Sequence, residues 1–296
     1  MLQELLSVIS LGSIYLLFAL GLSLTWGTID ILNFAHGAIF MFATFTAYLV
    51  LGSVQLPILG VVLVGVLVGA LLSLLIQVLA FEQILKRART KRSAEMQILI
   101  GGIGIATIPL AIAQRQTKSN PFGLSESSFD VNVWQFGDVR ITNVAVLTIV
   151  IGIALWAVTA LWFRRSKHGL ALRSIGVDSE VASLMGINRR QLALVTMAVS
   201  GGMAGLAGVL FTYTLGAITP ESGDILLIKA FAIVILGGVG SMLGVAFGAF
   251  ALAAVETWVL LNTSGSWTDA VAFGLIFLVL LVRPSGVFGR KEVRRA

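Results

Sequence analysis

Long apolar runs recur along the whole chain of 296 residues, and this repetition limits the fold more than any other feature. An apolar stretch of about 18 or more residues is long enough to cross a bilayer as a helix. We expect eight such segments, at residues 5–25, 31–52, 57–80, 96–114, 141–163, 192–216, 226–261 and 267–282. The predicted fold is an all-α polytopic membrane protein of about eight transmembrane helices, with residues 1–296 forming one transmembrane domain.

The composition supports a membrane domain rather than a soluble enzyme with an anchor. Charged residues make up 11% of the chain, against about 25% in soluble domains. The sequence contains no cysteine, which excludes disulfides and thiol chemistry. It contains only two histidines and offers no metal-ligating pattern, so we expect no metal site.

Basic residues indicate which way the chain crosses the membrane. Sixteen of the 20 lie at residues 82–95, 164–190 and 283–296. Short basic segments beside apolar spans mark the cytoplasmic side. The polar segment 115–140 balances three bases with three acids, so we predict that it forms an external loop. The N-terminus is then outside and the C-terminus inside, and nucleic-acid binding by the basic clusters is the weaker interpretation.

The segment 226–261 is too long for one crossing at 1.5 Å per residue. Its middle reads LGGVGSMLG and includes Gly237, Gly238 and Gly240, which we assign to the substrate path. One interpretation is a broken, re-entrant element that turns inside the membrane, where protein or a wet cavity must cover the irregular backbone. The alternative is two ordinary helices joined by a tight cytoplasmic turn.

The run TIDILNFAHGAIF places several polar residues within a predicted span. Ionisable and polar groups at membrane depth are costly and indicate function by default. We therefore add Asn33, His36 and Gly37 to the predicted substrate path, with a purely structural histidine as the competing interpretation. Lys229 and Glu256 are the other ionisable candidates, and Glu256 requires a partner, a wet wall or a place near the outer interface.

Nothing in the sequence predicts catalysis. A nucleotide-binding loop requires a glycine-rich run that ends in Gly-Lys-Ser/Thr, and the run GGVGSMLG lacks the lysine. No convergent acid, base or metal set is apparent. We therefore expect a non-catalytic membrane subunit, with no cofactor of its own and with any ATP hydrolysis performed by partners.

The segment 176–190 is unusual because it is amphipathic and lies between two basic flanks. Its apolar residues form one stripe at helical spacing: Val177, Val181, Leu184 and Met185. Asp178 or Ser179 is suited to cap the start of this helix, and Gly186 to end it. Such a helix either lies on lipid or docks into a partner's groove. Its acids favour docking, since helices that lie on lipid carry bases on the polar face.

These residues resemble the coupling loop of ABC-importer permeases, whose pattern is Glu-Ala-Ala, three residues, then Gly. The pattern reads here Glu180-Val181-Ala182, Ser183-Leu184-Met185, Gly186, although the Ile-x-Leu-Pro element of the general pattern is missing. One branch of these permeases departs from the general pattern in the same way, and the chain resembles that branch, the permeases of branched-chain amino acid importers. The runs around Asn33–Gly37, KAFAIVILGGVGSMLG and RPSGVFG resemble other elements of that family, in the same order. The length favours the LivH-type subunit over the longer LivM-type.

The resemblance implies a heteromeric importer in a bacterial inner membrane. A second, LivM-like permease would complete the translocation path, and two LivG/LivF-like ATPases would bind ATP and Mg. A periplasmic or lipid-anchored binding protein would deliver substrate, which in this family includes branched-chain amino acids, urea, amides and aromatic acids. The coupling residues would be Glu180, Ala182, Leu184, Met185 and Gly186.

Two other classes remain open at this point. A secondary transporter driven by an ion gradient would also use broken helices and intramembrane acids, and Glu256 gives that hypothesis some support. A structural or enzymatic membrane subunit is disfavoured because no catalytic set is visible. Copurification of ATPase subunits, or uptake that tolerates ionophores, separates an ABC-importer permease from a secondary transporter.

Overall fold

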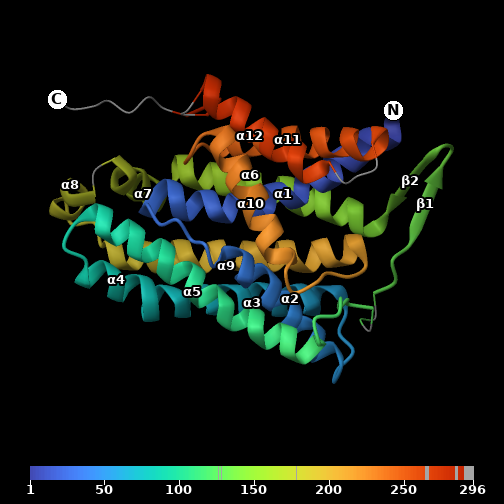
Figure 1. Ribbon diagram of the computed structural model, residues 1–296, viewed down its shortest axis with the longest axis horizontal. Coiled ribbons are helices and arrows are strands. Elements are labelled where there is room, and N and C mark those ends of the chain that lie inside the picture. Colours follow the sequence, from blue (N-terminus) through green and yellow to red (C-terminus); the bar gives the residue numbers. More distant parts are fainter. Residues whose placement is uncertain (126, 128, 178, 264–266, 284–285, 290–296) are drawn as a thin grey trace.

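The computed structural model describes residues 1–125, 127, 129–177, 179–263, 267–283 and 286–289. They form a bundle of helices with one small antiparallel hairpin (Figure 1). The elements are α1 (Leu2–Ile29), α2 (His36–Leu51), α3 (Ile58–Ile76), the π-helix η1 (Gln77–Phe81), α4 (Glu82–Arg87), α5 (Lys91–Thr117), β1 (Val133–Phe136), β2 (Val139–Thr142), α6 (Asn143–Arg165), α7 (Lys167–Val177), α8 (Ser179–Leu184), α9 (Arg189–Leu215), α10 (Ser222–Gly237), α11 (Met242–Asn262) and α12 (Thr268–Val282).

The helices confirm a polytopic membrane protein. Within the described residues, six helical stretches are long and apolar enough to cross a membrane: Leu2–Ile29, Ile58–Arg87, Arg92–Thr117, Asn143–Arg165, Arg189–Leu215 and Met242–Asn262. Three apolar helices are shorter, since α2 and α10 have 16 residues each and α12 has 15. Every predicted segment contains a helix, and the number of complete crossings stays a prediction.

Two helices form the centre of the bundle. Most of the apolar length of α1 and α9 is buried, whereas α3, α5 and α6 bury only about a fifth of theirs and form an outer layer. The core between them contains large side chains that solvent does not reach, such as Phe18 and Phe40. Their rings pack edge to face with centroids 5.3 Å apart.

The outer helix α3 lies against α9 through glycines on both partners. Gly65 and Gly69 on α3 face Gly201 and Gly205 on α9, and a Cβ at any of the four would overlap a side chain or backbone atom of the other helix. Paired Gly-x-x-x-Gly runs of this kind let two membrane helices approach backbone to backbone. The glycines within Ser200–Gly208 therefore serve helix packing.

The two ends of the bundle differ. The N-terminus and the hairpin β1–β2 lie at one end, and α4, α7 and α8 lie at the other (Figure 1). The basic segments around α4 and around α7–α8 therefore share an end, as the predicted orientation requires. The hairpin was not predicted within the polar loop 115–140; its tight turn depends on Gly137, whose φ is +62°.

The predicted break in segment 226–261 is present as the turn between α10 and α11. Gly238 and Gly240 have φ of +96° and +75°, which side chains disfavour. Gly240 packs against Gly27 in the last turns of α1, and Gly27 in turn approaches Gly176 of α7. The turn therefore lies at the α7 end of the bundle, as the two-helix interpretation requires, although α10 starts in the middle of the bundle, where Gly223 lies against Gly37.

The irregular backbone inside the bundle lies elsewhere, between α1 and α2. Asp30 ends α1 in the left-handed conformation, with φ of 59°. The Asn33 carboxamide oxygen then accepts a hydrogen bond from the Ala35 amide (3.1 Å), which forms a local turn. Helix α2 consequently begins at His36 rather than at the predicted residue 31.

Candidate functional site

The predicted coupling segment, residues 176–190, contains the short helix α8 between the end of α7 and the start of α9. Figure 1 shows α8 beyond α7, at the extreme opposite to the hairpin. Gly186 ends α8 as predicted: its φ is +83°, its amide bonds Ser183, and the Ile187 amide bonds Ala182. These two bonds are those of a Schellman cap. The proposed capping residue Asp178 lies outside the described residues.

The apolar residues of this segment face away from the rest of the chain. Leu184 is 86% exposed, Met185 79% and Val181 52%, while Ala182 on the opposite side is buried. The side chains of Val177 and Glu180 lie outside the described set. Apolar side chains this exposed at a helix end indicate a surface that another protein or a membrane covers. We call Val181, Leu184 and Met185 the apolar ridge.

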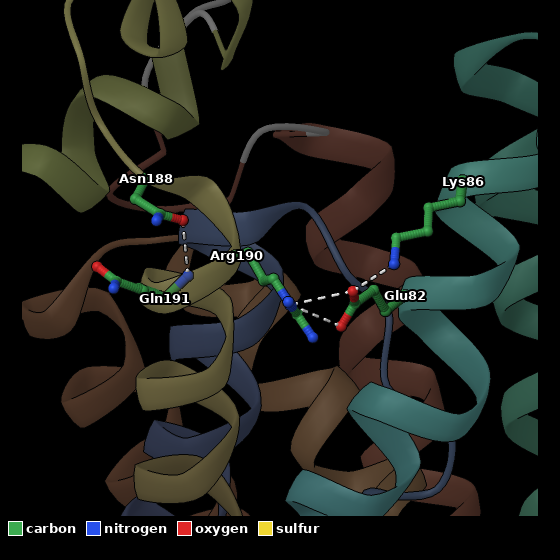
Figure 2. Close-up of polar contacts among 5 residues, drawn as sticks. All are labelled: Glu82, Lys86, Asn188, Arg190 and Gln191. Atoms are coloured by element: carbon green, nitrogen blue, oxygen red, sulfur yellow. Dashed lines mark hydrogen bonds and ion pairs between the residues drawn. The ribbon is translucent and has the colours of Figure 1, made fainter.

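Behind the ridge, ion pairs tie the start of α9 to α4 (Figure 2). The Asn188 side chain caps α9 by accepting a bond from the Gln191 amide (3.1 Å). Arg190 follows Asn188 by two residues, and its Nε lies 3.0 and 3.1 Å from the two carboxylate oxygens of Glu82. Lys86 Nζ lies 2.7 Å from the same carboxylate. The coupling segment is thus joined to the end of the continuous helical stretch Ile58–Arg87, which α3, η1 and α4 form.

A π-helix explains how Glu82 reaches α9. The five residues of η1 immediately precede it, and such a bulge widens one turn and shifts every later side chain around the helix. Phe81 is fully buried and Glu82 is only 7% exposed on the side that faces α9. Sequence reasoning missed this pair because it counted Arg190 only as part of a basic cluster. The signal available was one acid at the head of the basic segment 82–95.

The first group of predicted path residues is packed in the interior. His36 is fully buried beside the middle of α1 and α9: its Nε2 lies 3.1 Å from the Phe18 carbonyl oxygen and its Nδ1 3.5 Å from Ser200 Oγ. Asn33 is also fully buried, and its Nδ2 has no hydrogen-bond partner among the described residues. Gly37 lies directly against the backbone of Gly223, at the start of α10.

The second group lies at the other end of α10. Gly237 packs against the backbone of Gly244, and Gly238 against Gly289. The amide of Val287 bonds the Leu236 carbonyl (2.8 Å), so the stretch after α12 covers the turn. The two groups of predicted path residues are therefore separated in space, and α10 connects them. No cluster of three metal-ligating side chains occurs among the described residues.

Comparison with known proteins gives a consistent result. The family model described as the permease component of branched-chain amino acid transport systems matches residues 4–280. The chain is 32% identical to the high-affinity branched-chain amino acid transport system permease protein LivH of Escherichia coli K12, over 99% of this chain and 97% of that protein. It is 29% identical to the permease protein BraD of Pseudomonas aeruginosa, over 99% and 97%. No solved structure matches it.

Proposed function

Because the chain belongs to the family of branched-chain amino acid transport permeases, and is a permease subunit of an ABC importer, we propose that it forms half of the translocation path and is driven through α8. The observation that supports this coupling role is the apolar ridge, which is exposed on α8 at one extreme of the bundle. A hydrophobic ridge on a short helix suits a groove on a partner protein.

The partners follow from the proposed role. A LivM-like permease would complete the path, two LivG/LivF-like ATPases would receive the apolar ridge and bind ATP and Mg, and a periplasmic or lipid-anchored binding protein would deliver the substrate. The relatives support this assembly through their names, which describe permeases of transport systems. We place the multi-pass chain in a bacterial inner membrane, with α7 and α8 and the C-terminus cytoplasmic and the N-terminus outside.

We propose branched-chain or other hydrophobic amino acids as the substrate class, with small polar solutes such as urea, amides or aromatic acids as the related alternatives. For the path we propose the residues at both ends of α10. Asn33, His36 and Gly37 surround its start, and Gly237, Gly238 and Gly240 form its end.

Motion would pass from the ridge to the spans through two contacts between helices. Arg190 and Glu82 connect the exit of the coupling segment to α4. The glycine contact between α9 and α3 then makes the two helices move together. ATP binding by the partners need supply only a difference in contact free energy between the inward-open and outward-open states.

The substitution Met185→Asp tests this role. It adds a charge to a side chain that is 79% exposed, so the chain itself should fold normally. We expect ATPase copurification and substrate-stimulated ATPase activity to fall about tenfold or more, because a buried unpaired carboxylate opposes docking. Gly186→Pro should act similarly, since proline excludes the φ of +83°.

Met185→Leu is the matched control, because it keeps an apolar side chain of similar size and should retain assembly and activity. If Met185→Asp and Gly186→Pro both leave assembly and stimulated ATPase activity intact, the docking role of α8 is wrong.

A further inference from the structure

Three residues from three helices form a charged network inside the bundle. The Tyr15 hydroxyl donates to Glu256 Oε2 (2.5 Å), and Lys229 Nζ lies 2.9 Å from Glu256 Oε1. Lys229 also donates to the Tyr15 oxygen (3.2 Å). Tyr15 belongs to α1, Lys229 to α10 and Glu256 to α11. The network therefore joins α10 to its two neighbours.

The network lies at membrane depth. Tyr15 is at the centre of α1, and that helix is long enough to cross a bilayer. An ion pair in such a place is costly unless its geometry is good and its remaining polar atoms are satisfied. The pair is also asymmetric, since the Glu256 side chain is 2% exposed and the Lys229 side chain 15%. The carboxylate is enclosed, whereas part of the Lys229 side chain reaches the surface of the chain.

The surface that Lys229 reaches is one face of α10. Asp224, Ile225 and Ile228 are exposed on this face, while Leu226, Leu227 and Ala230 on the other side are buried. We call Asp224, Ile225, Ile228 and Lys229 the open face of α10. It begins beside Gly37 in the middle of the bundle, because Gly223 lies against Gly37.

The exposed face of α3 has the composition expected of a face in contact with lipid. The large side chains that α3 exposes are all leucines: Leu59, Leu63, Leu67, Leu71 and Leu75. The open face of α10 combines an acid, two isoleucines and a lysine. Ionisable residues at membrane depth face a bundle interior or a water-filled cavity, not acyl chains. The open face of α10 is therefore suited to a wet path.

We propose that the open face of α10 binds the substrate during translocation, and that this substrate is an aliphatic α-amino acid whose carboxylate pairs with the Lys229 ammonium. Ile225 and Ile228 lie within one turn of Lys229 and supply apolar contact for the alkyl side chain. Tyr15 and Glu256 position the ammonium and offset its charge when the site is empty. The assignment rests on the proposed function and names the substrate-binding residues within it.

The first experiment compares charge variants in the complete complex, reconstituted in proteoliposomes with its ATPases and binding protein. Lys229→Met combined with Glu256→Gln removes both charges and leaves no buried ion unpaired. We expect labelled leucine uptake to fall about tenfold or more, since a charge-assisted hydrogen bond is lost. The complex should still assemble, which copurification of its subunits checks. Lys229→Arg keeps a cation and should retain most of the uptake.

The second experiment places the substrate directly. Photo-leucine, a diazirine analogue that keeps the α-carboxylate, is delivered to the wild-type complex, trapped with vanadate and photolysed. We expect labelled peptides from α10 within residues 222–230. Labelling that avoids α10, or leucine uptake by the double variant within about twofold of wild type, overturns the proposal. A wild-type complex that imports only non-amino-acid solutes overturns the proposed substrate class and this site with it, and so is distinguishable from a failure of the site alone.

Discussion

Glu82 receives two cations from two different helices, and only one of these contacts joins separate parts of the chain. Arg190 reaches it from α9, whereas Lys86 lies one turn further along α4 itself. The Arg190 and Lys86 side chains are 65% and 60% exposed, so solvent screens both pairs and neither contributes much to stability. The Arg190–Glu82 pair matters because of where it lies, since it connects the coupling segment to the spans.

We expect Glu82→Ala to reduce leucine uptake by about two- to fivefold while ATPase subunits still copurify. The reason is that α9 loses its contact with α4 but the apolar ridge stays intact. Uptake per ATP hydrolysed in proteoliposomes is the measurement. Lys86→Ala is the matched control and should resemble wild type, since it removes a cation from the same carboxylate without separating two helices.

The exchange Glu82→Arg with Arg190→Glu should recover part of the uptake that either single change loses. Equal losses from Lys86→Ala and Glu82→Ala, or no recovery in the exchanged pair, would show that the contact between α4 and α9 does not matter.

Single residues also show where sequence reasoning ends. Gly186 could be predicted as a helix end because a left-handed cap leaves a local signature, a glycine after an apolar stripe. The partner of Glu256 could not, because Lys229 and Tyr15 are distant in sequence and only the packing of α1, α10 and α11 brings them together. His36 was singled out correctly as a buried polar group, and its hydrogen bond to Phe18 leaves both the path and the structural interpretation in place.

The contact between α3 and α9 depends on an approach of two backbones that only glycine allows. A Cβ on Gly205 would overlap the carbonyl oxygen of Gly65, which is backbone and cannot rotate away. Gly202 lies three residues before Gly205 on the same helix. A Cβ there would instead meet Val66 Cγ1 at 3.4 Å, an ordinary contact. The two glycines therefore form a matched pair for a packing test.

We expect Gly205→Ala to destabilise the protein by about 1–3 kcal/mol, the usual effect of overpacking, and Gly202→Ala to change stability little. Thermal unfolding in detergent, followed by loss of monodisperse protein on a sizing column, measures both. Equal midpoints for the two variants would contradict the close glycine contact between α3 and α9.

Helix types and their order could be predicted, whereas their irregularities could not. Apolar runs predict spans because a bilayer demands about 20 apolar residues whatever the packing. The π-helix η1 left no sequence signal, since its residues Gln77–Phe81 read as a regular apolar continuation of α3. The turn at Gly238–Gly240 was anticipated from glycine content, but its place at the α7 end depends on Gly27 and Gly176, which belong to other helices.

The whole molecule has two unlike ends, and the proposed mechanism needs both. One end carries the N-terminus and the hairpin β1–β2, and the other carries α4, α7 and α8 (Figure 1). The charge asymmetry of the loops predicted this separation from sequence, because basic segments stay on the cytoplasmic side. What sequence could not predict is that α10 runs steeply across the bundle from its middle to the α7 end, since that course follows from contacts of Gly223 and Gly240.

The chain lacks cysteine, so one introduced thiol reports on one position. Met185→Cys, carrying a thiol-attached benzophenone, should crosslink to an ATPase subunit on photolysis. In intact cells the same thiol should resist a membrane-impermeant maleimide that labels Asp138→Cys, in the turn of the hairpin. That pattern is the predicted result. Labelling of the residue-185 thiol from outside the cell, or photolysis that never captures an ATPase subunit in the assembled importer, would contradict coupling through α8.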